Sequence, residues 1–258
     1  MPEQIAADQG SVGVLLVHGL NGGRDDMLEL SEHLAQQGLI TENILLPGHG
    51  THVWDMLPIG WAEWAAAVRA ELQALKARCT RVFLVGHSLG GALCLHVAAS
   101  EPVTGIVTMC APIEMFPGML NAVRLVRHFT PWLPTLREDI HDPVARRLRQ
   151  RTREVYRRTP MAPVESMLQY LPLLRAELPQ VTAPILIMVA RQDHVVPARD
   201  GRTIYRLVGS QEKYLVTFHR SYHVIMKDHE RDEVFARTLI FIQKHLPATG
   251  HPLPYHTI

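Results

Sequence analysis

Hydrophobic side chains along the chain gather in six short runs that are rich in β-branched and aliphatic residues. Runs of this kind are typical of β-strands. The six predicted strands cover Val12–Val17, Ile40–Leu46, Arg81–Val85, Gly105–Met109, Pro184–Ala190 and Lys213–Phe218.

Segments with helical periodicity lie between most of these runs. Residues 25–37 and residues 61–77 carry apolar side chains at helical spacing, namely Met27, Leu28, Leu30 and Leu34 in the first and Trp64, Val68, Leu72 and Leu75 in the second. Strands that alternate with helices predict an α/β fold with a mostly parallel sheet covered on both faces. Such sheets bind ligands beyond the carboxyl ends of their strands, so we expect the functional site there.

The alternation stops between residues 113 and 181, where we find no strand pattern and where several helical stretches are interrupted by prolines. We expect a helical insertion over the carboxyl edge, because it begins just after one predicted strand and ends just before the next. The prediction is therefore a core made of residues 1–112 and 182–258, with a cap of residues 113–181. Residues 248–258 have no periodic face and are predicted to form a loosely held terminus.

Composition narrows the class of protein. Hydrophobic residues make up 47% of the 258 residues and charged residues 20%, within the range of soluble globular proteins. A formal net charge of +1 gives no indication of a nucleic-acid partner. The first ten residues lack a basic start, and no segment approaches about 18 uninterrupted apolar residues, so we expect a soluble, cytoplasmic protein.

The three cysteines, Cys79, Cys94 and Cys110, are widely spaced and belong to no CxxC motif or Cys/His cluster in the sequence. Neither a disulfide framework nor a zinc site is indicated. We predict buried, reduced thiols and no bound metal.

The most informative motif is Gly86-His87-Ser88-Leu89-Gly90-Gly91, which follows a predicted strand and leads into a helical segment. In a G-x-S-x-G turn, the serine occupies a strained corner between strand and helix, and its hydroxyl points out at the top of the sheet. Ser88 is thus the candidate nucleophile. The alternative is a glycine-rich turn with a serine that has no chemical role.

A serine hydroxyl is a weak nucleophile until a base takes its proton, and the base in turn needs a group that orients it. Asp193 directly follows the strand predicted to end at Ala190, and His223 comes just after the last predicted strand. Both therefore belong at the carboxyl edge of the sheet. We predict that Ser88, Asp193 and His223 form a catalytic triad.

Other residues compete for these roles. The rival histidines are His87, His96, His194, His219 and His229, of which His219 is the strongest because it lies closer to the strand end than His223. Asp228 is the rival acid. It follows His223, which breaks the order serine, acid, histidine, and we expect it to cap a helix from about residue 230 to residue 244.

An oxyanion formed during acyl transfer needs preorganised N–H donors. We expect one from Leu89, the residue after the nucleophile, and one from Leu20 in the glycine-rich loop 18–23 that follows the first strand. That loop has two other interpretations, a phosphate-binding loop or a plain flexible turn. It contains neither G-x-x-x-x-G-K-[ST] nor G-x-G-x-x-G, so a nucleotide site is not predicted.

Five motifs together resemble a known family. They are His18-Gly19-Leu20-Asn21-Gly22, Leu46-Pro47-Gly48-His49-Gly50, Gly86-His87-Ser88-Leu89-Gly90-Gly91, Arg191-Gln192-Asp193-His194-Val195-Val196-Pro197 and Ser221-Tyr222-His223-Val224-Ile225. Over about residues 12–246 the chain resembles α/β-hydrolases, and more narrowly the small bacterial carboxylesterases and monoacylglycerol lipases.

The resemblance implies an α/β-hydrolase fold, a mostly parallel sheet flanked by helices with a small helical cap inserted. It also implies no cofactor, and hydrolysis of carboxylic esters or monoglycerides through an acyl-serine. The family triad falls on Ser88, Asp193 and His223, and the oxyanion donors fall on Leu20 and Leu89. Two positions depart from the family pattern, since Tyr222 and Ala190 stand where glycine is common, and either is expected to narrow the pocket.

The predicted cap gives hints about the substrate. Residues 115–123 are apolar and rich in methionine, which suits an acyl-chain pocket, although core packing explains them nearly as well. The candidate lining residues are Met115, Met119, Leu120, Val195 and Ile225. Residues 137–158 are rich in arginine, which indicates either a solvated helical face or attraction to an anionic lipid surface or to acyl-CoA phosphates.

The leading hypothesis is a serine esterase that acts on a small-molecule ester or monoglyceride. A thioesterase or a cofactor-free perhydrolase would use the same residues on another acyl donor, and a ligand-binding protein would keep the pocket without turnover. A metal enzyme is the weakest alternative, because His49 and His52 lack a companion carboxylate. The sequence indicates no particular oligomeric state.

Overall fold

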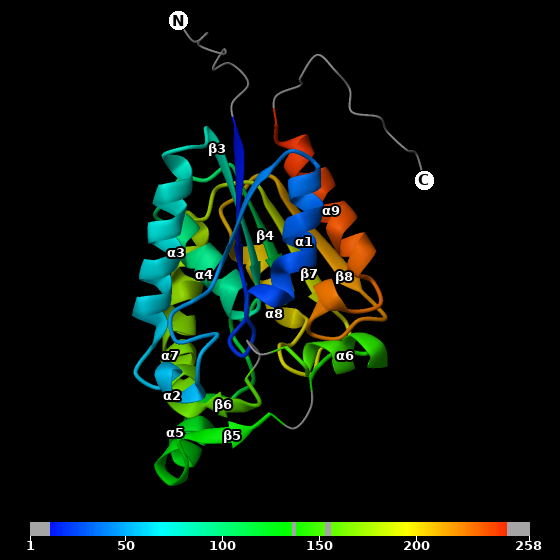
Figure 1. Cartoon of the computed structure of the whole chain (residues 1–258). Helices are drawn as coiled ribbons and strands as arrows, with labels where there is room; N and C mark the ends of the chain where they lie inside the picture. Colours follow the sequence, from blue (N-terminus) through cyan, green and yellow to red (C-terminus); the bar gives the residue numbers. More distant parts are fainter. Residues whose placement is uncertain (1–10, 136–137, 153–155, 247–258) are drawn as a thin grey trace, which may run out of the picture.

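The core of the protein is a six-stranded parallel sheet in the order β2-β1-β3-β4-β7-β8 (Figure 1). We describe it from a computed structural model, which covers residues 11–135, 138–152 and 156–246. The strands are β1 (Val12–Val17), β2 (Ile40–Ile44), β3 (Arg81–His87), β4 (Gly105–Met109), β7 (Ile185–Ala190) and β8 (Lys213–Phe218). The α/β class predicted from the alternating pattern is confirmed.

Helices cover both faces of this sheet because its strands are apolar on both sides. In β1, Val14 and Leu16 pack on one side and Leu15 and Val17 on the other, as the two-residue repeat of a strand requires. The first side carries α1 (Arg24–Gln36) and α9 (Arg231–Lys244). The second carries α3 (Trp61–Lys76), α4 (Leu89–Ala98) and α8 (Arg199–Leu207).

The described residues between 113 and 181 lie outside the six-stranded sheet, mostly at the end where the strands finish, at the bottom of Figure 1. Together with the short helix α2 (Val53–Met56), they cover that end. Their elements are α5 (Met119–Phe129), β5 (Trp132–Pro134), α6 (Pro143–Arg149), β6 (Arg158–Pro160), α7 (Met161–Glu177) and the 3₁₀ helix η1 (Leu178–Gln180).

The prediction that this segment contains no strand is wrong. β5 and β6 pair antiparallel, with Trp132 opposite Pro160 and Pro134 opposite Arg158. Each strand is only three residues long and contains a proline, so neither shows the alternation by which strands are recognised in a sequence.

Three further expectations concern the rest of the chain. Cys79, Cys94 and Cys110 are free and buried, as predicted. The predicted loose terminus, residues 248–258, lies outside the described residues. Among the residues that are described, no helix has both the length and the hydropathy needed to cross a membrane.

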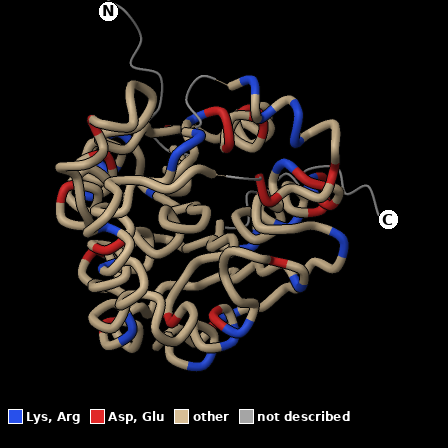
Figure 2. The backbone as a smooth tube through the Cα atoms, turned by 90° about the horizontal axis from the view of Figure 1, so that it is seen from below, with Lys and Arg blue, Asp and Glu red and all other residues tan. Residues whose placement is uncertain are grey.

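Charged positions of both signs are intermingled along the backbone in the view from the capped end. Lys and Arg positions lie among those of Asp and Glu (Figure 2), in keeping with the net charge of +1.

Candidate active site

Ser88 occupies the tight turn between β3 and α4 with strained backbone angles, φ 51° and ψ −121°. A non-glycine residue at positive φ costs about 1–3 kcal/mol, and the surrounding backbone must hold it in place. The N–H of Ser88 donates to the carbonyl of Met109 at 2.8 Å. A Cβ at Gly90 would lie 2.2 Å from the carbonyl oxygen of Val17, so only glycine lets this turn approach β1.

Asp193 and His223 form a nearly buried pair beside this turn. His223 Nδ1 lies 2.7 Å from Asp193 Oδ2, and the two side chains are 8% and 1% exposed. The other oxygen, Oδ1, accepts the N–H groups of Val195 and Val196, both at 2.8 Å.

The charge state of Asp193 fixes the tautomer of His223. Burial alone would raise the pKa of Asp193, but the interaction with His223 and the two backbone donors outweigh it, so the pKa lies below its ordinary value. An ionised carboxylate accepts hydrogen bonds only, so the shared proton sits on His223 Nδ1. The other ring nitrogen, Nε2, is then left with a lone pair that can accept a proton.

One cavity of about 420 Å³ brings the predicted nucleophile and base together. Its wall includes Ser88, His223, Gly19 and Leu20. It opens at the carboxyl edge of the sheet, where the alternating pattern placed the site.

Two buried histidines hold the loop that carries Leu20. His18 Nε2 accepts the N–H of Leu46 at 3.1 Å, so the ring proton sits on Nδ1, which donates to the carbonyl of Gly19 at 2.9 Å. His49 Nε2 bonds to the carbonyl of Leu20 at 2.5 Å. Burial, with a smaller contribution from His49, lowers the pKa of His18 to about 3, and burial also lowers the pKa of His49. Both rings are therefore neutral near pH 7.

These bonds orient the expected oxyanion donors. In a trans peptide the C=O and the following N–H point to opposite sides, so fixing the Gly19 carbonyl on His18 turns the Leu20 N–H the other way. The Leu89 N–H is the first amide of α4, a position that has no acceptor within a helix.

The rival residues have other contacts. The ring of His87 is buried, its centre lies 4.8 Å from that of His223, and Nε2 donates to the His223 carbonyl at 3.1 Å. Burial, together with the charge of His223, lowers the pKa of His87 to about 3. His219 is exposed, and its N–H donates to Glu230.

The prediction that Asp228 caps the last helix is wrong. The residue that precedes α9 is Glu230, and no side chain caps this helix. The Asp228 carboxylate instead accepts backbone N–H groups from His141, Asp142, Tyr222 and His229. Asp228 therefore ties the segment before α6 to the loop that carries His223, a long-range contact that local sequence does not reveal.

Three of the five candidate lining residues, Met115, Met119 and Val195, line the cavity with Ser88, whereas Leu120 and Ile225 do not. Leu120 faces a neighbouring cavity against α7, because the first turns of α5 present positions 119 and 123 to the site. Ile225 begins the 3₁₀ helix η2 (Ile225–Lys227) and is fully buried in the core, so Val224 takes its place in the wall.

Tyr222 and Ala190 do not narrow the cavity, contrary to expectation. Neither belongs to its wall. The ring of Tyr222 stacks on that of His141, with centres 4.5 Å apart, and Ala190 is fully buried in the core.

Arg149 departs from the solvated face that the arginine-rich segment indicated. Its guanidinium is buried and makes two hydrogen bonds to Asp26, at 2.6 and 2.8 Å, and a further contact with Glu138. Burial opposes both charges, but the pairing prevails: the pKa of Asp26 is lowered and that of Arg149 is raised. All three side chains belong to the cavity wall.

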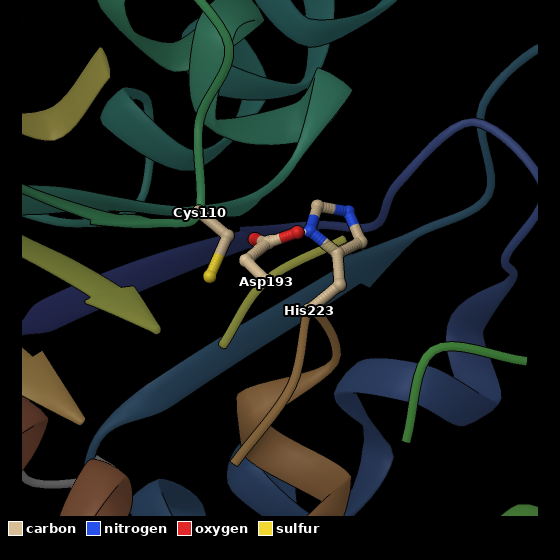
Figure 3. Close-up of side chains that lie close together, drawn as sticks. All are labelled: Cys110, Asp193 and His223. Carbon is tan, nitrogen blue, oxygen red and sulfur yellow. Dashed lines mark hydrogen bonds and ion pairs between the residues drawn. The ribbon is translucent and has the colours of Figure 1, made fainter. Parts of the chain in front are cut away.

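Cys110 is a neighbour of the site that sequence reasoning missed. Its Sγ and the ligand atoms of Asp193 and His223 lie within 4.8 Å of one another (Figure 3), although no Cys/His cluster is visible in the sequence. Asp193 and His223 are bonded to each other, and burial raises the pKa of the thiol well above its ordinary value. The donor set therefore suits a hydrogen-bonded pair better than a metal centre.

Comparison with known proteins agrees with this geometry. Residues 11–230 match the family described as "Serine aminopeptidase, S33". A thermostable monoacylglycerol lipase from Bacillus sp. (strain H-257) is 34% identical over 247 residues, which cover 94% of this chain and 95% of the relative. A carboxylesterase from Bacillus subtilis (strain 168) is 27% identical over 250 residues, covering 94% and 97%.

Solved structures agree as well. One from a study of LipS and LipT, two metagenome-derived lipolytic enzymes, superposes with a TM-score of 0.84 at 33% identity and covers 92% of this chain and 95% of that one. The sheet order, the serine turn and these matches lead to one assignment. The chain belongs to the serine aminopeptidase S33 family of α/β-hydrolases.

Proposed function

We propose that this protein hydrolyses carboxylic esters, including monoacylglycerols, with Ser88 as nucleophile, His223 as base and Asp193 as its orienting acid. The observation that carries the proposal is the Asp193–His223 bond of 2.7 Å, which leaves Nε2 of His223 facing the cavity that Ser88 also lines. The names of the two curated relatives, a monoacylglycerol lipase and a carboxylesterase, support the ester as substrate.

The reaction proceeds in two halves. His223 Nε2 takes the hydroxyl proton of Ser88 as Oγ attacks the ester carbonyl, and the N–H groups of Leu20 and Leu89 hold the resulting oxyanion. Asp193 stabilises the imidazolium, which then gives the proton to the departing alcohol and leaves an acyl-serine. A water, deprotonated by His223, attacks this ester, and the proton returns to Ser88 as the carboxylic acid leaves.

The cavity wall contains both apolar and polar side chains. Its apolar residues suit an acyl chain and include Met115, Met119, Val123, Met161, Val164 and Met167. Its polar residues suit a hydroxyl-bearing alcohol and include Asn21, Thr135, Glu138, Arg149 and Thr159. A volume of about 420 Å³ favours short to medium acyl chains over long ones.

Residues 113–181 act as a cap over this cavity and dock on an anionic lipid surface. Val144 and Leu148 on α6 are 63% and 61% exposed, and two arginines near them are also exposed, Arg147 on α6 and Arg151 in the turn that follows it. Apolar side chains flanked by arginines are typical of helices that lie at the surface of a membrane. This arrangement supports the lipid contact that the arginine-rich segment indicated.

Hydrolysis of p-nitrophenyl esters and of monoacylglycerols, with acyl groups from acetate to laurate, tests the proposal with the intact protein and Ser88→Ala. We expect activity on both substrate classes and its loss in the variant. An acyl-CoA thioester and an aminoacyl p-nitroanilide distinguish the thioesterase and aminopeptidase alternatives. Faster turnover of either of these than of every ester would make the proposal wrong.

A further inference from the structure

Asp139 lies between β5 and α6, in the segment proposed as the cap, yet its carboxylate contacts both loops that carry the proposed acid and base. Its side chain is 15% exposed. Oxygen Oδ2 accepts the N–H of His194, the residue after Asp193, at 3.0 Å and the N–H of His223 at 3.2 Å. One oxygen atom thus connects the loop after β7 with the loop after β8.

Two further bonds fix the same residue. Oδ1 lies 2.7 Å from the ring Nδ1 of His194, which holds the carboxylate from the solvent side. The backbone carbonyl of Asp139 accepts the N–H of Val224 at 3.2 Å. His223 therefore has a bond to Asp139 at its own N–H and another at that of the next residue.

We propose that Asp139 is a positioning residue of the active site: it fixes the spacing of the two loops so that His223 Nδ1 meets Asp193 Oδ2. The inference rests on the proposed function, since it assigns Asp139 a part in the same reaction. Asp139 belongs to the wall of the cavity, but its carboxylate bonds to the backbone of His194 and His223 and to the ring of His194, so it acts on the reaction through these neighbours. It also makes the segment before α6 part of the catalytic geometry.

Asp139 contributes to the alignment of the two loops. Hydrogen bonds to a charged acceptor are stronger than those to a neutral one, and Asp139 accepts two from the backbone of these loops. The same loops are also joined by the Gln192 side chain, which donates to the carbonyl of His219 at 2.5 Å, but this contact lies on the exposed side. Losing Asp139 would leave the loops connected while the alignment of His223 is relaxed.

The test compares Asp139→Ala with Asp139→Asn, using kcat and KM on a soluble p-nitrophenyl ester and the low-field proton resonance of the His223 Nδ1–H. In Asp139→Ala we expect kcat to fall about 10- to 100-fold with little change in KM, because small misplacements of a catalytic group have effects of this size. The resonance should shift or broaden. Asp139→Asn keeps an oxygen that can accept both N–H groups and should recover most of kcat.

Asp142→Ala is the matched control. Its side chain caps α6 through the N–H groups of Val144 and Ala145, so the substitution weakens the same segment without touching either loop. We expect unchanged kcat and an unchanged resonance. If Asp139→Ala does not fold, Asp139→Glu displaces the carboxylate with its charge retained, and a loss of about 10-fold in kcat is expected.

A folded Asp139→Ala or Asp139→Glu protein with the parent's kcat and resonance would overturn the inference. The resonance is measured without substrate, so it tests Asp139 even if the intact protein hydrolyses no ester. In that case the proposed function fails, whereas a resonance shift in Asp139→Ala would still show that Asp139 positions His223.

Discussion

The ring of His18 holds the carbonyl oxygen of Gly19 at 2.9 Å from Nδ1, while its Nε2 accepts the N–H of Leu46. The ring is fully buried, and its pKa of about 3 keeps it neutral, so this pattern of one donor and one acceptor persists at every pH at which the protein would be assayed. The direction of the Leu20 N–H is therefore determined in part by the side chain of His18, the residue that follows β1, and not by the loop alone.

His18→Ala should lower kcat about 100-fold, because removing one oxyanion donor has effects of this size and the substitution releases the peptide that carries the Leu20 N–H. KM should change little, since the ground-state ester does not need the donor. Steady-state kinetics and the affinity for a trifluoromethyl ketone analogue measure this effect. The loss in kcat and the loss in affinity for the analogue should be of similar size. His96→Ala is the control, since that ring bonds to Glu177 on α7; equal kcat in the two variants would contradict the assignment.

Asp193→Asn and Asp228→Asn should separate the two carboxylates that the sequence left as rivals. Asp193→Asn removes the acceptor that keeps the His223 proton on Nδ1, and we expect kcat to fall about 10⁴-fold with a small change in stability. Asp228→Asn replaces the acceptor of four backbone N–H groups, so it should lower the free energy of unfolding by about 2–4 kcal/mol.

Urea unfolding and ester kinetics on both variants provide the comparison. The loss of kcat in Asp228→Asn should stay below about 10-fold, because Asp228 bonds to the N–H of Tyr222 and not to that of His223, and none of its hydrogen bonds within the described residues reaches the loop that carries Asp193. The reverse outcome, with the larger kinetic loss in Asp228→Asn, would assign the acid to Asp228.

The serine turn and the strands that carry the site could be predicted because their signals are local. β1, β4 and β8 have the predicted limits, and β2, β3 and β7 differ from theirs by one or two residues at an end. The Gly-x-Ser-x-Gly turn is likewise contained in five consecutive residues. Asp193 and His223 are predictable for a related reason, since each follows a parallel strand and the carboxyl ends of such strands meet at one edge.

Contacts of the inserted segment could not be predicted, because each depends on a partner far along the chain. Arg149 is one arginine among many in its segment, and only the fold shows that Asp26, 123 residues earlier, buries it. Asp139 meets the backbone of His223 across 84 residues, and a backbone N–H leaves no trace in a sequence. The register of α5, which turns Leu120 away from the cavity, also depends on tertiary packing.

Breaking the Asp26–Arg149 pair should destabilise the protein strongly. Arg149→Met leaves the Asp26 carboxylate buried without its partner, and unpaired buried charges cost about 3–5 kcal/mol. The double variant Asp26→Asn with Arg149→Met should recover only part of the loss, since residue 26 no longer carries a charge whereas the buried Glu138 still lacks the contact with Arg149. Thermal and urea unfolding of the single and double variants measure the coupling; additive losses would show that the two side chains do not interact.

The same pair predicts a pH dependence of stability. The pKa of Asp26 is lower in the folded protein than in the unfolded chain, where it is about 3.9, so ionised Asp26 stabilises the fold at neutral pH. This contribution is complete above about pH 5 and is lost as the pH falls through the folded-state pKa. Asp26→Asn should therefore show a smaller loss of unfolding free energy than the parent between about pH 5 and pH 3.

Gly90→Ala should disrupt the turn of Ser88. The new Cβ would meet the backbone carbonyls of Val17 and His18 at 2.2 and 2.6 Å, and backbone cannot move aside as a side chain can. We expect a loss of several kcal/mol in stability together with the loss of activity. Gly38→Ala is the control that separates steric clash from backbone strain. Gly38 has φ 82° but open space around it, so this substitution introduces strain without a clash and should lower the stability by only about 1 kcal/mol. Equal effects in the two variants would contradict the packing argument.

Reversing the charges of Arg147 on α6 and of Arg151 just after it should weaken binding to anionic vesicles. Each arginine near an anionic membrane contributes about 1 kcal/mol, so Arg147→Glu with Arg151→Glu should reduce binding to phosphatidylglycerol vesicles about 30-fold or more. Co-sedimentation measures this, and turnover of a soluble p-nitrophenyl ester should be unchanged, because neither arginine lines the cavity. Arg78→Glu with Arg81→Glu makes the same change of charge at the start of β3, at the opposite end of the sheet. If both double substitutions weaken vesicle binding equally, the net charge of the protein and not the position of α6 determines the binding.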